Sequence, residues 1–406
     1  MNSQNNTYEG NSVSSQNGGA VENVGDLKIN GDTFTNNSAN GTTSSGGAVA
    51  NDFIKQFDGN GNLIGTYRGQ AEVKNATFNN NTAKNTGGAV YNLSKMTSQN
   101  STYTGNKATG GGAVSNDTPA GQSVSTFASI NDKFEKNTAT SVGGAIYNTA
   151  NATFDGAVFT ENSAVQGGAI YNTGTVTLNN AYKTKFYDNK ASGVGSAVYN
   201  TGTFTINNAS DTIDLDYVPH TGVAFPAKKV KLFADGEDIY NNGIINVNNS
   251  DLQLHYDDDL TKGFINVHES LTKRKTGTIN VTNSRIDIGK TILYGDAINL
   301  YDGSELLTHV NAASGTEFGR IQANNIYVSP NDTDITISVA AGEHLNEGES
   351  KIFHILNASG ELNATAPNGF KNITENKMYD IKYLGDGKYQ LSRPGKEPEE
   401  SDPSDP

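Results

Sequence analysis

Residues 78–92 of this chain read Phe-Asn-Asn-Asn-Thr-Ala-Lys-Asn-Thr-Gly-Gly-Ala-Val-Tyr-Asn. The stretch combines two elements: an aromatic residue with asparagine three positions later, and Gly-Gly-Ala before a β-branched residue. Seven such units follow one another in the first half of the chain, and their first glycines lie 28, 41, 24, 32, 24 and 28 residues apart. A repeat of this length indicates a solenoid, in which each unit buries its apolar face only by stacking on its neighbours.

The units agree closely with one another. The aromatic and asparagine pairs are Tyr8/Asn11, Phe34/Asn37, Phe78/Asn81, Tyr103/Asn106, Phe134/Asn137, Phe159/Asn162 and Phe186/Asn189. The glycine pairs are Gly18-Gly19, Gly46-Gly47, Gly87-Gly88, Gly111-Gly112, Gly143-Gly144 and Gly167-Gly168, and the last unit has Gly195-Ser196.

The repeats also predict which side chains face the core. The residue after Gly-Gly-Ala is always Val or Ile, the next one varies, and the one after that is always asparagine, as in Asn92, Asn148 and Asn172. Because strand side chains alternate between the two faces, we expect the β-branched residue and the asparagine inside and the variable residue outside.

The strand pattern predicts an all-β fold. Residues 173–180 and 201–208 alternate apolar residues with threonine, and helical periodicity is essentially absent. Three short strands for each coil of about 24 residues, joined by glycine and asparagine corners, predict a right-handed parallel β-helix with rungs about 4.8 Å apart. The paired glycines suit corners that need a positive φ or leave no room for a Cβ. The inward asparagines can bond the corner backbone and the asparagine one rung away, because an unpaired buried polar group is costly.

Four regions are expected along the chain. They are a β-helix of clear repeats (1–210), degenerate rungs (211–330), a C-terminal β cap with a hairpin turn at Gly385-Asp386-Gly387 (331–392), and a disordered acidic linker (393–406). The first repeat begins without a capping unit ahead of it, so we expect the chain to be part of a longer protein.

Two units are too long for a bare coil. Residues 53–68 contain two strand-like runs around a turn and predict a hairpin that projects from the solenoid. The additional residues of the second long unit lie near residues 117–122. Insertions of this kind map to one face of a solenoid, which is often the binding face.

The composition excludes several classes of function. A net charge of -14 and a pI near 4.9 argue against a nucleic acid or an anionic membrane surface as partner. The chain has no cysteine, which excludes disulfides and thiolate metal sites. No run of about 18 apolar residues occurs, so we expect no membrane-spanning helix and no direct membrane insertion, and no secretion signal is visible at the N-terminus.

The aromatic-x-x-Asn and Gly-Gly-Ala-Val/Ile elements resemble the repeats of polymorphic outer membrane proteins and related autotransporter passenger domains. The resemblance covers roughly residues 8–200, and the segment before the linker is similar in style to the autochaperone-like cap that ends an autotransporter β-helix. It implies a passenger on the surface of a Gram-negative bacterium, at the outer membrane or secreted, commonly an adhesin and virulence factor. The lack of cysteine differs from the cysteine-bearing chlamydial members.

Candidate chemical sites compete with simpler interpretations. Asp211, Asp214 and Asp216 could form the paired carboxylates of a glycosidase, or the edge of a solvated strand. Residues 257–259 are three aspartates that could bind Ca²⁺ or form a charged turn. Asp58, Asn60 and Asn62 resemble the start of a calcium loop, but glycine and the bidentate glutamate are missing from their places. Histidines occur with no metal-ligand spacing at positions 220, 255, 268, 309, 344 and 354.

The outward position of the repeat is the best candidate for recognition. Tyr147, Tyr171 and Tyr199 occupy it in successive rungs and form an aromatic strip if the rungs are in register. Aromatic side chains are favoured at binding surfaces, but such a ladder also stabilises a sheet without any partner.

We therefore expect a surface-displayed passenger that acts by contact, as an adhesin or self-association module, through the sheet faces, the hairpin and the candidate partner-binding residues Asp58, Asn60 and Asn62. The expected partner is a host-cell surface protein or glycan, or another copy of the chain. No catalytic residue and no cofactor are predicted. The alternatives are a carbohydrate-active β-helix enzyme, a polysaccharide lyase or hydrolase, and a passive structural stalk.

Overall fold

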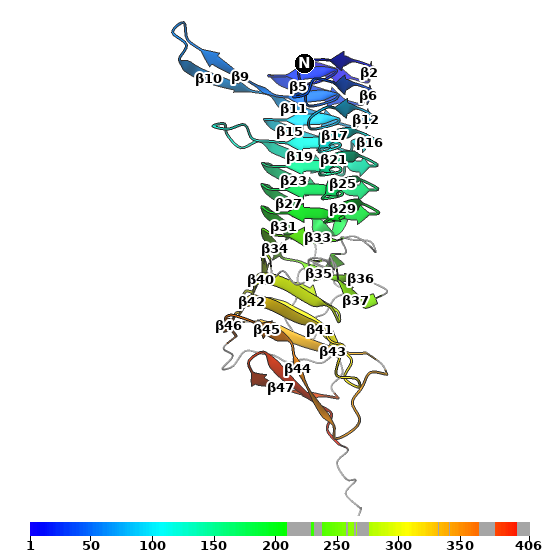
Figure 1. The fold of residues 1–406 in the computed structure, drawn as a ribbon, viewed down its shortest axis with the longest axis vertical. Coiled ribbons are helices and arrows are strands. Elements are labelled where there is room, and N and C mark those ends of the chain that lie inside the picture. Colours follow the sequence, from blue (N-terminus) through cyan, green and yellow to red (C-terminus); the bar gives the residue numbers. More distant parts are fainter. Residues whose placement is uncertain are drawn as a thin grey trace, which may run out of the picture.

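The computed structural model describes residues 1–208, 229–230, 238–256, 259–263, 265, 276–331, 333–340, 342–364 and 378–395. These residues form short β-strands and one 3-10 helix, η1 (Ala181–Lys183). Strands of successive coils pair in parallel, and the coils stack into one elongated column (Figure 1). The predicted all-β fold, a parallel β-helix, is confirmed.

Four parallel sheets form the walls of the repeat stack, the name used here for the coils within residues 1–208. The long sheet starts there with β1 (Asn2–Gln4), β5 (Asp26–Asn30), β11 (Gln70–Lys74), β15 (Lys95–Gln99), β19 (Thr126–Ile130), β23 (Asn151–Asp155), β27 (Thr175–Asn179) and β31 (Thr203–Asn207). The aromatic sheet contains β2 (Thr7–Glu9), β6 (Thr33–Thr35), β12 (Thr77–Asn79), β16 (Thr102–Thr104), β20 (Lys133–Glu135), β24 (Val158–Thr160) and β28 (Lys185–Tyr187).

The other two walls follow in chain order. The alanine sheet contains β3 (Ser12–Val13), β7 (Ser38–Ala39), β13 (Thr82–Ala83), β17 (Lys107–Gly110), β21 (Thr138–Val142), β25 (Ser163–Gln166) and β29 (Lys190–Val194). The tyrosine sheet contains β4 (Val21–Asn23), β8 (Val49–Asn51), β14 (Val90–Asn92), β18 (Val114–Asn116), β22 (Ile146–Asn148), β26 (Ile170–Asn172), β30 (Val198–Asn200) and β33 (Ile239–Asn241).

The expectation of three strands per coil is wrong, because a coil of the repeat stack has four. The residue just before each aromatic-x-x-Asn asparagine has a positive φ, for example 54° at Asn80, and this turn separates the aromatic strand from the next one. The turn residues are Gly10, Asn36, Asn80, Gly105, Lys136, Glu161 and Asp188. Their mixed chemistry explains why the extra corner left little signal in the sequence.

Three ladders run through the interior of the repeat stack. The aromatic residues from Tyr8 to Phe186 stack ring on ring, with centroids 4.7–5.0 Å apart. The asparagines of the same element form a chain of amide hydrogen bonds from Asn11 to Asn189, each 2.8–3.0 Å long. A second chain of 2.7–2.8 Å bonds joins the asparagines of the tyrosine sheet, from Asn23 to Asn241. Asn148 also donates to the corner carbonyl oxygens of Ala150 and Thr175, so both predicted reasons for inward asparagine are confirmed.

Each glycine of the pair has a different role at the corner. Gly144 shows the steric one, because a Cβ there would lie 1.9 Å from the carbonyl oxygen of Gly168 in the next coil. Gly143, like the first glycine of every pair, has a positive φ, here 64°. Ser196 is tolerated at the last second-glycine position, where its hydroxyl donates to the Asp238 carboxylate at 2.5 Å.

Beyond β33, the lower stack, which comprises the described coils between residues 229 and 363, replaces three of the walls by one. The long sheet continues with β34 (Ile244–Asn248), β38 (Thr278–Thr282), β40 (Ile292–Leu300), β42 (Arg320–Val328), β45 (Leu356–Ala358) and β46 (Leu362–Asn363). The opposing parallel sheet contains β32 (Lys229–Val230), β35 (Asp251–Gln253), β39 (Arg285–Asp287), β41 (Glu305–Val310) and β43 (Asp334–Val339). A small antiparallel pair is formed by β36 (His255–Tyr256) and β37 (Asp259–Gly263). Coil pairing thus continues past residue 330.

A three-stranded antiparallel sheet follows the last coils. Its strands are β44 (Ser350–His354), β47 (Asp380–Gly385) and β48 (Lys388–Ser392). The predicted hairpin turn lies between β47 and β48, and Asp386 and Gly387 both have positive φ. Phe353, Tyr389 and Leu391 are fully buried and belong to the same apolar core as the stack. Of the predicted linker, residues 396–406 lie outside the described residues.

Candidate functional site

The 41-residue unit projects a β-hairpin from the column, as predicted. Its strands are β9 (Phe53–Phe57) and β10 (Leu63–Arg68), which pair antiparallel with each other and leave the stack between β8 and β11 (Figure 1). The two ends of the insertion meet at its base, where the Gly69 amide donates to the Asp52 carbonyl at 2.8 Å. The coil therefore closes beneath the hairpin as it does in units without one.

A single arginine joins this hairpin to the second insertion. Arg68 donates to the carbonyl oxygens of Leu93 and Ser123, at 2.7 and 2.5 Å, and to the hydroxyl of Ser125 at 3.1 Å. The second insertion leaves the stack between β18 and β19, two coils below the hairpin strands, and contains no strand between residues 117 and 125. Both insertions thus lie at the corner between the tyrosine sheet and the long sheet.

Sequence reasoning missed the role of Arg68. The usable signal is its rarity: it is the first arginine of the chain, and the next is Arg274. A planar guanidinium with five donors can bind several carbonyl and hydroxyl oxygens at once, which a lysine cannot do with the same geometry.

Exposed apolar side chains gather at the same corner. Of the fifteen large apolar side chains exposed in the described part of the chain, seven lie on the two insertions or on the coil above the hairpin, each 41–59% exposed. These seven, named here the apolar corner, are Val24, Ile54, Phe57, Leu63, Ile64, Tyr67 and Val124. Val24 belongs to this set because its neighbour Gly25 accepts a 2.7 Å hydrogen bond from the amide of Gln70, just after the hairpin.

The predicted calcium-like residues form the tip of the hairpin. The Asp58 carboxylate accepts the amides of Asn60 and Asn62, both at 2.8 Å, and the Asn62 side-chain amide at 3.0 Å. These bonds, with the Asn62 amide first, lower the pKa of Asp58 and keep it charged. Asp58 and Asn62 thus close a tight polar turn. Among the described residues, no group of three or more histidine, cysteine or acidic side chains is placed to hold a metal ion.

The tyrosine strip is in register. Tyr147, Tyr171 and Tyr199 pair directly across β22, β26 and β30, and Tyr240 on β33 extends the strip by one rung. Tyr171 and Tyr199 stack with ring centroids 4.8 Å apart and planes within 3°, and Tyr240 continues the stack at 4.9 Å. The ring faces of Tyr171, Tyr199 and Tyr240 therefore cover one another, whereas the ring of Tyr147 is tilted by 42° to that of Tyr171 at 5.8 Å. This geometry favours the sheet-stabilising interpretation over a platform on which a ligand ring could stack.

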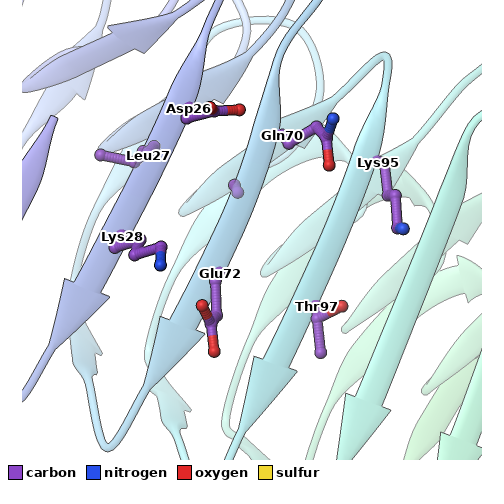
Figure 2. A pocket seen from close by; sticks show the side chains of 8 residues that line it. Asp26, Leu27, Lys28, Gln70, Glu72, Lys95 and Thr97 are labelled. Carbon is purple, nitrogen blue, oxygen red and sulfur yellow. The ribbon is translucent and has the colours of Figure 1, made fainter.

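An open groove of about 380 Å³ lies on the outer face of the long sheet (Figure 2). Side chains of both charges line it, including Asp26 and Lys28 on β5, Glu72 on β11 and Lys95 on β15. The Glu72 carboxylate is exposed and ion-paired with Lys74 in its own strand, which lowers its pKa. A charged carboxylate of this kind does not supply the general acid that glycoside cleavage requires.

Several predicted candidates lie outside the described residues: Asp211, Asp214, Asp216, Asp257, Asp258, His220 and His268. The third aspartate of the triplet, Asp259, begins β37. Two histidines contact neighbours in the lower part of the molecule: His309 lies 3.3 Å from the Asp287 carboxylate, and His344 shares a 2.8 Å hydrogen bond with the Tyr379 hydroxyl.

The fold and the apolar corner define a class of protein: a repeat-built parallel β-helix whose insertions carry six of the fifteen exposed large apolar side chains of the described residues. Three segments, residues 75–93, 133–149 and 156–173, match the model of the Chlamydia polymorphic membrane protein repeat. Each contains one aromatic-x-x-Asn element and the following Gly-Gly-Ala element. These matches confirm the resemblance of the repeats to those of polymorphic outer membrane proteins. Proteins of that family are surface-located and adhesin-like.

No curated protein sequence matches the chain. In the part of the chain that the structure describes, no helix is both long enough and apolar enough to cross a membrane.

Proposed function

We propose that this chain acts by contact on the bacterial surface, as an adhesin or a self-association module, and that the apolar corner is its contact site. One observation carries the proposal: about half of the exposed large apolar side chains of the described residues gather at one corner of a long polar column. A concentration of exposed apolar side chains in one region marks interaction sites on soluble proteins. The partner is a host-cell surface protein or glycan, or another copy of the chain.

The construction of the corner supports this function. The stack closes beneath the hairpin through the bond between Gly69 and Asp52, so the insertion is not needed to complete its coil. Arg68 nevertheless holds the hairpin against the second insertion with bonds to Leu93, Ser123 and Ser125. Fixing a projecting element in one orientation lowers the entropy that binding must overcome.

Deletion of residues 53–68, with Asp52 rejoined to Gly69, tests the proposal. We expect the purified chain to lose binding to cultured epithelial cells and to bacteria that display the same chain. Circular dichroism and the thermal midpoint should stay close to those of the parent, because no coil strand is removed.

A matched control removes exposed apolar side chains far from the corner. Ile352, Met378 and Leu384 are 41–57% exposed, and a triple serine variant at these positions should keep full binding. Undiminished binding by the deletion variant would contradict the proposal by placing the contact site elsewhere on the chain, whereas absence of binding by the parent chain would favour the passive stalk. Incubating the same preparation with pectin-like and host-type glycans tests the enzymatic alternative, for which new reducing or unsaturated ends are the positive result.

A further inference from the structure

The hairpin is a sheet of only two strands. Among the described strands, none pairs with the outer edge of β9 or of β10. An isolated two-stranded hairpin is marginally stable in water, and a long apolar edge readily accepts another strand. The hairpin is therefore open to completion by a third strand.

The two edges are not equivalent. Strand β10 has a register shift between Leu63 and Gly65, which places Ile64 in a bulge, and bulges protect edges from pairing. Strand β9 is a regular run of five residues with neither glycine nor proline. Its outer edge is the one suited to an incoming strand.

The side chains of β9 specify what that strand should contain. Phe53, Lys55 and Phe57 point to one face, opposite Arg68, Thr66 and Leu63 of β10, and Ile54 and Gln56 point to the other. On the first face, Lys55 lies between two aromatic rings and is exposed. A complementary strand would present an acidic side chain opposite Lys55 and apolar side chains two positions to either side.

The side-chain pattern of β9 disfavours a second copy of the chain or a lipid bilayer as the partner of its free edge. A second copy that paired β9 with its own β9 about a two-fold axis at Lys55 would place two lysines opposite each other, which is destabilising. A bilayer would have to accept the polar tip, where Asp58 is held charged, and an anionic one would repel a chain with a net charge of -14.

We propose that the free edge of β9 binds an extended segment of a partner protein by β-strand addition, and that Lys55 selects a segment with an acidic residue at its centre. This inference rests on the proposed contact function and names the chemistry of the partner. The backbone of β9 supplies the hydrogen bonds, and Phe53 and Phe57 supply the apolar contacts on either side of the charge pair.

Synthetic peptides test the proposal on the full chain. The probe is a fluorescent nine-residue peptide with glutamate at its centre, phenylalanine two positions to either side and threonine elsewhere, and its matched counterpart has lysine at the centre. Fluorescence polarisation should show the glutamate peptide binding about fivefold more tightly, the scale of one cross-strand charge pair. The variant Lys55→Glu should reverse this preference, whereas Lys28→Glu on the exposed face of β5 should leave it unchanged.

Hydrogen exchange identifies the edge. The glutamate peptide should slow exchange of the β9 amides and leave the outer edge of β10 unaffected. The proposal is overturned by equal affinity for the two peptides, by protection of β10 instead of β9, or by sedimentation of the free chain as a dimer that deletion of residues 53–68 abolishes. If cell binding still depends on the hairpin while neither peptide binds, this inference fails and the proposed contact function stands.

Discussion

The repeat stack and the lower stack share one wall and differ in the others. The long sheet runs through both, but the repeat stack closes with three further walls of short strands, whereas the lower stack closes with a single opposing sheet. Strands in the lower stack reach nine residues in β40 and β42, against five in β27. All six residues of β43 are buried. Frequent corners leave more backbone N–H and C=O groups outside the strand ladders than long strands do. The two regions therefore need different hydrogen-bond partners for these groups.

The position of the amide ladders shows this difference. In the repeat stack both asparagine ladders are buried and bond corner carbonyls as well as each other, as Asn148 does with Ala150 and Thr175. In the lower stack the asparagine ladder lies on the outer face of the long sheet, where Asn280 bonds Asn246 and Asn299. The asparagine ladders therefore contribute buried polar contacts between coils in the repeat stack and surface contacts in the lower stack.

The largest effect should come from the corners built on Gly-Gly pairs, which occur only in the repeat stack. Gly144→Val should destabilise the fold by about 5 kcal/mol or more, because backbone atoms of the next coil lie where the side chain would stand. Gly25→Ala is the matched control, since a Cβ there meets nothing within 4 Å. Urea denaturation of both variants measures the difference, and a loss of less than about 1 kcal/mol for Gly144→Val would refute the steric role.

The next largest effect is the difference in stability cost between substituting an asparagine of a buried ladder and one of the outer ladder. Asn148→Leu should cost about 4 kcal/mol, because the Asn116 side chain that donates to it and the Asn172 side chain that accepts from it both lose a buried bond. Asn280→Ala, on the outer ladder, should cost less than about 1 kcal/mol, since water replaces the lost partners. Equal costs in thermal and urea unfolding would mean that burial does not separate the two regions.

Replacing a buried acid by its amide should have opposite effects on stability in the two regions at pH 7.5. Asp132 in the repeat stack accepts the Ser101 amide and the Ser129 hydroxyl, and burial raises its pKa from 3.8 to about 6. The stability from its bound proton is complete below about pH 3.8 and is lost as the pH rises through about 6. Asp132→Asn should therefore stabilise the fold by up to about 3 kcal/mol at pH 7.5 and have little effect at pH 3.5.

The contrasting acid is Glu305 of the lower stack, which is buried but ion-paired with Arg285 at 2.9 Å. Glu305→Gln should destabilise at pH 7.5, because the charge of Arg285 loses this partner. Thermal midpoints of both variants at the two pH values provide the test, and a stabilised Glu305→Gln would contradict the assigned difference.

The smallest effect is expected on the tyrosine strip. Tyr199→Ala removes two ring stacks, with Tyr171 and Tyr240, and should cost about 1 kcal/mol while leaving cell binding intact. If the variant kept its stability but lost binding, the strip would be a contact surface rather than a stabilising ladder.

Much of the repeat stack was predictable from local chemistry. The aromatic, glycine and asparagine spacing predicted the column, the inward asparagines, the hairpin at residues 53–68 and the strip through Tyr171. The fourth strand per coil was not predicted, because its corner needs only a positive φ, which residues as different as Asn80 and Lys136 adopt. The link from Arg68 to Ser123 also escaped, since it joins residues 55 positions apart that meet only when the coils stack.

A chemical pattern repeated along the chain is enough to specify a stack of coils here. Every unit has the same apolar side chains to bury and the same polar groups to hydrogen-bond, and it does both against a neighbour with the same pattern. The apolar corner is different. Its residues come from three separate coils, and neither their grouping nor the free edge of β9 exists until the coils align and Arg68 joins the two insertions. Spatial proximity between unlike segments is decided by the assembled fold, since no local preference of the chain encodes it.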